Sequence, residues 1–206
     1  SKMAVSVNAS TDASSSSQSA FDNATNIFQD DFKRLSPKTF KILSLVAVHA
    51  GKLDVTTMLS ILSARSPINE SEIIDGLAEL ELKALVSRDG TQYLIYHKII
   101  EKAVIATMVE SDLKCLHGDI ADFLIANSDI CNHGIVGRHL LEAGNLEKAR
   151  LQFFEAAESA NSSGSAVEVI DYLSKAFAIP SLKNADRIIE GHFSFCWVSV
   201  ITRLGI

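Results

Sequence analysis

The sequence is poor in helix-breaking residues, with 3 prolines and 10 glycines among 206 residues. Hydrophobic residues make up 47% of the chain, which is typical of a helical globular protein and not of a disordered chain or a β protein with many turns. The length is sufficient for one or two small domains, each with its own hydrophobic core. The composition therefore predicts a mainly α fold.

Cysteine and long apolar runs are scarce as well. The three cysteines, an odd number, do not make a disulfide framework, which indicates a reducing compartment. No apolar stretch approaches the roughly 20 residues of a membrane-spanning helix, and residues 1–20 lack the apolar core of a signal peptide. We therefore expect a cytoplasmic protein with no membrane partner. Because Ser1 is not an initiator methionine, we also expect a fragment of a longer protein.

An excess of positive charge is missing, since 19 basic residues face 25 acidic ones and the net charge is -6. This balance argues against a nucleic-acid partner held mainly by electrostatics. The shortage is sharpest between Asn69 and Lys83, a predicted helix with five acidic residues and one basic residue. Such a helix would repel the phosphates of a DNA groove, so we do not expect nucleic acid as a partner.

Signatures of catalysis and metal binding are also missing. The stretch HAGKLD at residues 49–54 fails as a phosphate-binding loop, because Val46 stands where that loop needs glycine and Leu53 where it needs serine or threonine. Cys115 and His117 are two positions apart in a predicted helix, so they point in nearly opposite directions and do not readily hold one metal ion. We expect no catalytic residue, no metal site and no cofactor held by this chain alone.

The chain divides into three predicted parts. Residues 1–27 are rich in serine and lack periodic hydrophobicity, which predicts a disordered lead. Residues 28–110 combine three helical patterns with two short apolar runs joined through Asp89-Gly90, a pair suited to a tight hairpin. Three helices followed by one small β-hairpin predict a winged-helix domain. The predicted helices begin at Ser36, Asp54 and Asn69, and the predicted strands are residues 85–87 and 92–96.

Residues 111–206 predict a helical linker and the start of tetratricopeptide-like helical hairpins. Gly144 and Gly164 each open a helix in which small and large residues alternate at helical spacing, as stacked helix pairs require. Because fewer repeats are visible than such arrays usually need, we expect the array to be truncated and to continue past residue 206. Three aromatic residues either pack between helices or line a groove for a protein or peptide partner. The candidates for partner binding are Phe154, Tyr172 and Phe177.

Four stretches, taken in order around the acidic helix, carry a family resemblance. They are RLSPKTFKILSLVAVHAGKLDVTTML, YLIYHKIIEKAVIATM, DLKCLHGDIADFL and HLLEAGNLEKARLQFFEAAESANSSGSAVEVIDYLSKAF. Their order and spacing over residues 28–206 resemble the segment that follows the ATPase core in STAND-type signalling ATPases. The chain is most similar to the versions in soluble-adenylyl-cyclase-like class III nucleotide cyclases, and next to those in LuxR-type ATP-dependent regulators.

The resemblance implies a regulatory relay without catalysis of its own. In such proteins the winged-helix unit packs on an upstream ATPase core, which binds ATP or ADP with Mg, and passes its state to downstream helical repeats. His97 matches a histidine that contacts the β-phosphate of ADP in some relatives, so it is the candidate nucleotide sensor. The alternative is that His97 only caps the junction between strand and helix.

Two other functions compete with the relay. One is a free-standing helical-repeat scaffold that binds protein or peptide partners, and it predicts no dependence on nucleotide. The other is a winged-helix DNA-binding regulator, which the acidic third helix disfavours.

Overall fold

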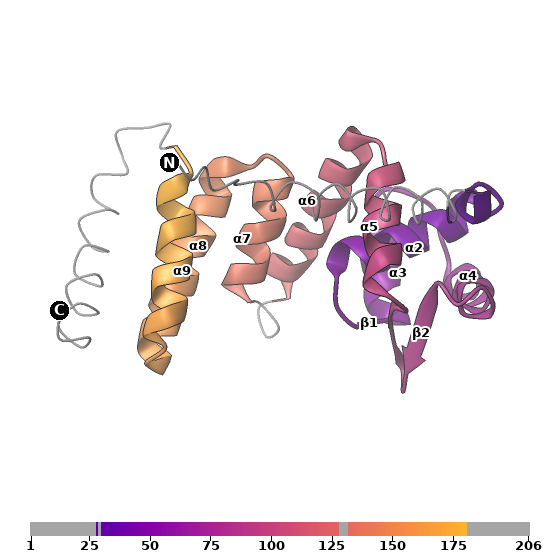
Figure 1. Ribbon diagram of the computed structural model, residues 1–206, viewed down its shortest axis with the longest axis horizontal. Coiled ribbons are helices and arrows are strands. Elements are labelled where there is room, and N and C mark those ends of the chain that lie inside the picture. The colour runs from indigo at the N-terminus through magenta and orange to yellow at the C-terminus, as the bar shows by residue number, and fades with distance from the viewer. Residues whose placement is uncertain (1–27, 29, 128–131, 181–206) are drawn as a thin grey trace, which may run out of the picture. The chain divides into compact units, whose positions relative to one another are not determined.

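The computed structural model describes residues 28, 30–127 and 132–180 (Figure 1). This part of the chain is mainly helical and contains a three-stranded antiparallel sheet, so the predicted mainly α class is confirmed. The chain divides into two compact units, with the boundary between Val109 and Glu110. The predicted disordered lead, the end of the predicted array and Cys131 lie outside the described residues. Within these ranges, no helix combines the length and the apolar character needed to cross a membrane.

Unit 1 is built around α2 (Pro37–His49), whose residues from Ile42 to Val48 are all buried. The helix begins where the Ser36 hydroxyl accepts a hydrogen bond from the Thr39 amide at 3.0 Å, with proline at the first helical position. It ends at Ala50, which has a left-handed φ of 56°. Helix α5 (Lys98–Thr107) packs on α2.

Helices α3 (Val55–Ser63) and α4 (Glu70–Leu82) begin at strong caps. The Asp54 carboxylate accepts hydrogen bonds from the Thr56 hydroxyl and the Thr57 amide, and these bonds lower the pKa of Asp54. Asn69 and Glu72 form a capping box at the start of α4. Local hydrogen bonding therefore fixes both helix starts where the sequence predicted them.

The sheet has the strand order β1-β3-β2. The predicted hairpin is confirmed as β2 (Val86–Asp89) and β3 (Gln92–Ile95), but the turn is Gly90-Thr91, with Gly90 at a φ of 63°. Strand β1 (Leu53–Asp54), in which Leu53 pairs with Tyr93, was not predicted from the sequence. A strand of two residues has no alternation to detect, which explains the omission.

Unit 2 consists of helices that pack on their neighbours in chain order. Small side chains let α8 approach the adjacent helices closely, since Ala149, Ala156, Ala157 and Ala160 are all buried. Gly144 and Gly164, each with a φ of 81°, make the turns before and after α8. The helices are α6 (Glu110–Ala126), α7 (His133–Glu142), α8 (Leu146–Ser163) and α9 (Ala166–Ala178).

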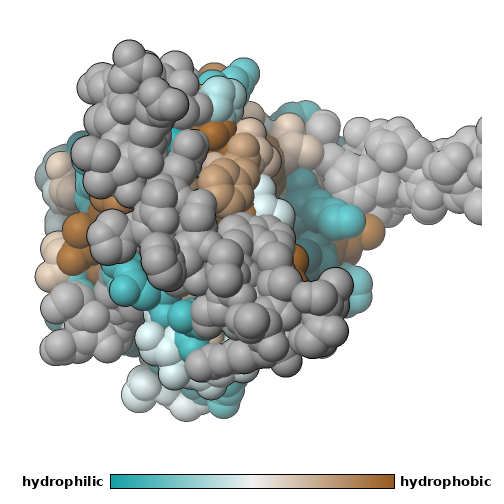
Figure 2. Space-filling view, turned by 90° about the vertical axis from the view of Figure 1, so that its left-hand side faces the viewer, coloured by the Kyte–Doolittle hydropathy of each residue, from teal (hydrophilic) through white to brown (hydrophobic). Residues whose placement is uncertain are grey.

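The outer side of α9 keeps apolar side chains in contact with solvent. Val167 is 80% exposed, and Ile170 and Phe177 are also exposed. Figure 2 views the molecule from the side on which α9 lies and shows both hydrophobic and hydrophilic side chains on this face. Helix α9 therefore packs one face on α8, and its exposed side carries these apolar side chains together with charged ones such as Asp171 and Lys175.

Candidate functional site

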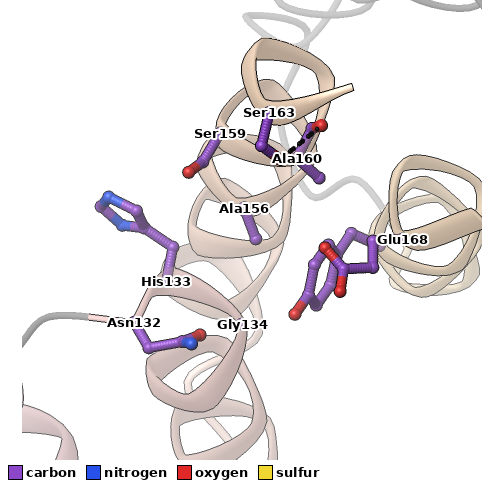
Figure 3. Close-up of a pocket in the computed structure, with 9 residues that line it drawn as sticks. Asn132, His133, Gly134, Ala156, Ser159, Ala160, Ser163 and Glu168 are labelled. Carbon is purple, nitrogen blue, oxygen red and sulfur yellow. Dashed lines mark hydrogen bonds between the residues drawn. The ribbon is translucent and has the colours of Figure 1, made fainter. Parts of the chain in front are cut away.

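A pocket of about 190 Å³ lies where the start of α7, the second half of α8 and the first half of α9 meet (Figure 3). Gly134, Ala156 and Ala160 are the small residues among those that line it. Most of its lining residues are polar, and this combination of small residues with polar groups suits a compact polar group of a ligand or peptide. The polar lining residues are Asn132, His133, Ser159, Ser163, Glu168 and Tyr172.

Several of these polar groups are already engaged. Asn132 caps α7, because its side-chain oxygen accepts a hydrogen bond from the Ile135 amide at 3.2 Å. His133 Nδ1 lies 2.9 Å from the Gln152 side-chain oxygen, and Figure 3 shows the His133 ring turned away from Glu168. His133 and Glu168 therefore do not form an acid–base pair.

Tyr172, predicted as a partner-binding residue, lines this pocket. A Cβ atom at Gly134 would lie 2.5 Å from the Tyr172 ring, so the ring occupies its place only because residue 134 is glycine. The Lys175 ammonium lies 5.5 Å from the centre of the ring, within the range of a cation–π contact. The binding role of Tyr172 stays a prediction.

The prediction that Phe154 lines a groove is wrong, because its side chain is buried. Its side chain is 1% exposed and packs edge-on against Phe177 at a centroid distance of 5.6 Å. The Arg150 guanidinium lies 5.4 Å from the centre of the Phe154 ring. Phe153 and Phe154 both enter the core because α8 has neighbours on two sides, α7 and α9. Phe177 is 44% exposed and remains available to a partner.

His97 lies at the junction of β3 and α5, away from the pocket in sequence and in a different unit. Its side chain is exposed, and its Nδ1 accepts a hydrogen bond from the Ile99 amide at 3.3 Å. The structure thus places His97 at the N-cap of α5, which is the structural alternative. Contact with a nucleotide phosphate stays a prediction.

Two buried histidines form a contact that was not predicted from the sequence. His117 on α6 and His139 on α7 are both buried, and their Nδ1 atoms are 2.9 Å apart. Burial lowers the pKa of His117; the nearby Glu142 carboxylate raises it and the Arg138 guanidinium lowers it. The two histidines are 22 positions apart, so local spacing carries no sign of the pair.

No group of three or more His, Cys, Asp or Glu side chains is arranged to hold a metal ion within the part of the chain that the structure describes. Comparison with known proteins assigns no family, because no protein-family model, no curated protein and no solved structure matches the chain.

Proposed function

We propose that this chain is a non-catalytic relay of a cytoplasmic STAND-type signalling ATPase, whose effector is of the nucleotide cyclase kind. Unit 1 is the winged-helix domain and receives the nucleotide state of an ATPase core that holds ATP or ADP with Mg. Unit 2 begins the tetratricopeptide-like sensor. The observation that carries the proposal is the order of elements: three helices, a hairpin, a capped helix and then helices packed in sequence.

Charge on α4 supports a relay over DNA binding. The helix that would enter the major groove carries five acidic residues and has no basic residue before Lys83. The acidic residues are Glu70, Glu72, Asp75, Glu79 and Glu81. Such a helix is repelled by phosphate, whereas a protein partner can accommodate it.

A peptide-binding scaffold is the second candidate, and the pocket on α7, α8 and α9 favours it. Tyr172 lines the pocket and Phe177 lies exposed on the same helix, so both could contact a bound peptide. This function needs no nucleotide and makes binding independent of ADP.

The test of the relay uses the longer protein that includes an ATPase core. His97→Ala removes both the cap of α5 and any phosphate contact, whereas His97→Ser keeps a capping oxygen and removes only the phosphate contact. If His97 senses nucleotide, both variants lose about tenfold in ADP affinity, which corresponds to about 1.4 kcal/mol.

Wild-type ADP affinity for His97→Ser, with a weaker affinity or a lower stability only for His97→Ala, would make His97 a structural cap. Equal affinity for both variants and the wild type would leave the scaffold as the better function. Circular dichroism of both variants controls for loss of fold.

A further inference from the structure

The outer face of α4 carries a row of apolar side chains that the fold does not use. Ile74, Ala78 and Leu82 are spaced four residues apart, so they lie along one side of the helix. Ile74 is 47% exposed and Leu82 is 88% exposed, while Ala78 is also exposed. The opposite side of α4 packs in unit 1 through Ile73, Leu77 and Leu80. We call Ile74, Ala78 and Leu82 the α4 ridge.

Rows of side chains at this spacing are the ridges that insert into the grooves of a second helix. A single exposed leucine is ordinary on a protein surface. Three apolar positions in register on one helix face, with Leu82 almost fully exposed, match the pattern by which one helix recognises another. The α4 ridge therefore has the geometry of a helix-packing surface.

Acidic side chains border the α4 ridge on both sides. At 100° per residue, Glu70 and Glu81 fall on one side of the ridge and Asp75 on the other. None of these three carboxylates takes part in an ion pair among the described residues.

The inner acids of α4 are engaged within unit 1. Glu72 pairs with Lys38, and Glu79 accepts a hydrogen bond from the Thr39 hydroxyl at 3.1 Å. The negative charge that remains available is therefore concentrated along the exposed α4 ridge.

The negative charge beside the α4 ridge determines which kinds of partner can bind there. Nucleic acid and anionic lipid would meet like charge, and so would the same face of a second copy of this chain. A helix with an apolar stripe flanked by lysine or arginine is complementary to this surface. Its apolar stripe would pack on the α4 ridge, and its basic side chains would pair with the acidic border, as in paired helices with complementary flanking charges.

We propose that the α4 ridge is a docking surface for a protein partner that presents a basic amphipathic helix. The apolar row supplies the contact area, and the acidic border supplies orientation and faster association. The inference stands without the relay function, because it rests only on the surface of α4.

The probe is a fluorescent amphipathic peptide of about 18 residues, with leucine on one helical face and lysine on the other, titrated with the whole chain. Ile74→Gln combined with Leu82→Gln keeps helix propensity and removes the apolar row. We expect this double variant to bind the peptide at least about tenfold more weakly. Val167→Gln, at an 80% exposed apolar position on α9, is the matched control and should change the affinity less than about twofold.

A second pair of variants tests the border. Glu70→Gln combined with Glu81→Gln should weaken peptide binding and reduce its dependence on salt, because two bordering charges are removed. The substituted side chains are exposed or half-buried, so unchanged circular dichroism and melting temperature are expected for every variant.

Three results would overturn the proposal. The double variant could bind the peptide as tightly as the wild type does, or an equivalent leucine and glutamate peptide could bind as well as the basic one. Sedimentation could also show a dimer of the wild type that the double variant lacks, which would assign the ridge to a second copy of the chain.

Discussion

His117 and His139 face each other through their Nδ1 atoms at 2.9 Å, in the interface between α6 and α7. Both side chains are buried, and their ring planes are inclined by 44°. The Arg138 guanidinium lies 3.3 Å from His139 Nε2 on the other side of the ring. A polar chain from arginine through two imidazoles thus joins two helices of unit 2.

The donor of each contact follows from chemistry. A guanidinium only donates, so His139 Nε2 accepts and a neutral His139 carries its proton on Nδ1. That proton is donated to His117 Nδ1, and a neutral His117 therefore carries its own proton on Nε2. Protonation of His117 would set two N–H groups against each other at this contact.

The first prediction concerns the pH dependence of stability. Burial holds the pKa of His117 below its usual value of 6.5, so the unfolded chain takes up a proton first as the pH falls. The contribution of His117 to stability is complete above about pH 6.5 and is lost progressively as the pH drops from there to its folded pKa. Denaturant unfolding followed between pH 8 and pH 5 should show this loss.

His117→Gln is the matched variant, because its side-chain oxygen accepts from His139 but does not titrate. The stability of the variant should fall less than that of the wild type over the same pH range. Parallel pH profiles for the two proteins would show that the His117 proton does not contribute.

The second prediction compares two helical glycines. A Cβ at Gly137 would lie 2.9 Å from the Phe153 ring, which is buried and has little room to move. Overpacking of about 1–3 kcal/mol should outweigh a gain in helix propensity of up to about 1 kcal/mol. We expect Gly137→Ala to lower the free energy of unfolding by about 1 kcal/mol.

Gly118 on α6 is the control, because a Cβ there would meet no atom within 4 Å. Gly118→Ala should raise the free energy of unfolding by about 0.5–1 kcal/mol. If urea unfolding gave both substitutions the same sign, the close approach of α7 and α8 at Phe153 would be contradicted.

The third prediction separates core from surface on α8 and α9. Phe154→Ala removes a buried ring and should cost about 3–5 kcal/mol of unfolding free energy. Phe177→Ala should cost about 1–2 kcal/mol, because its ring is 44% exposed and mainly contributes the edge contact to Phe154. Chemical denaturation of both variants decides the point, and equal costs would contradict the assignment of Phe154 to the core.

Local signals explain what could be predicted from the sequence. Ser36 with Pro37, and Asn69 with Glu72, satisfy helix-start hydrogen bonds within a few residues of chain, so their effect is visible in the sequence. The β2–β3 hairpin was predicted from two short apolar runs joined through Asp89-Gly90, which is also a local signal.

Contacts between distant residues explain what could not. Phe154 was a candidate for a partner-binding groove, but α8 has neighbours on both sides, and the rings of Phe153 and Phe154 are both buried. The pairing of His117 with His139 depends on the register between α6 and α7, which no local pattern contains. The same holds for Gly134, whose missing Cβ makes room for Tyr172 in the candidate pocket.

The most direct test of the relay is amide hydrogen exchange of the longer protein, measured with bound ADP and with a bound ATP analogue. We expect exchange in unit 1, above all in β3 and α5 around His97, to differ between the two nucleotides, and exchange in α6 to α9 to change as well. The isolated chain should show no response to either nucleotide. Identical exchange across residues 28–180 in the two states would contradict the relay.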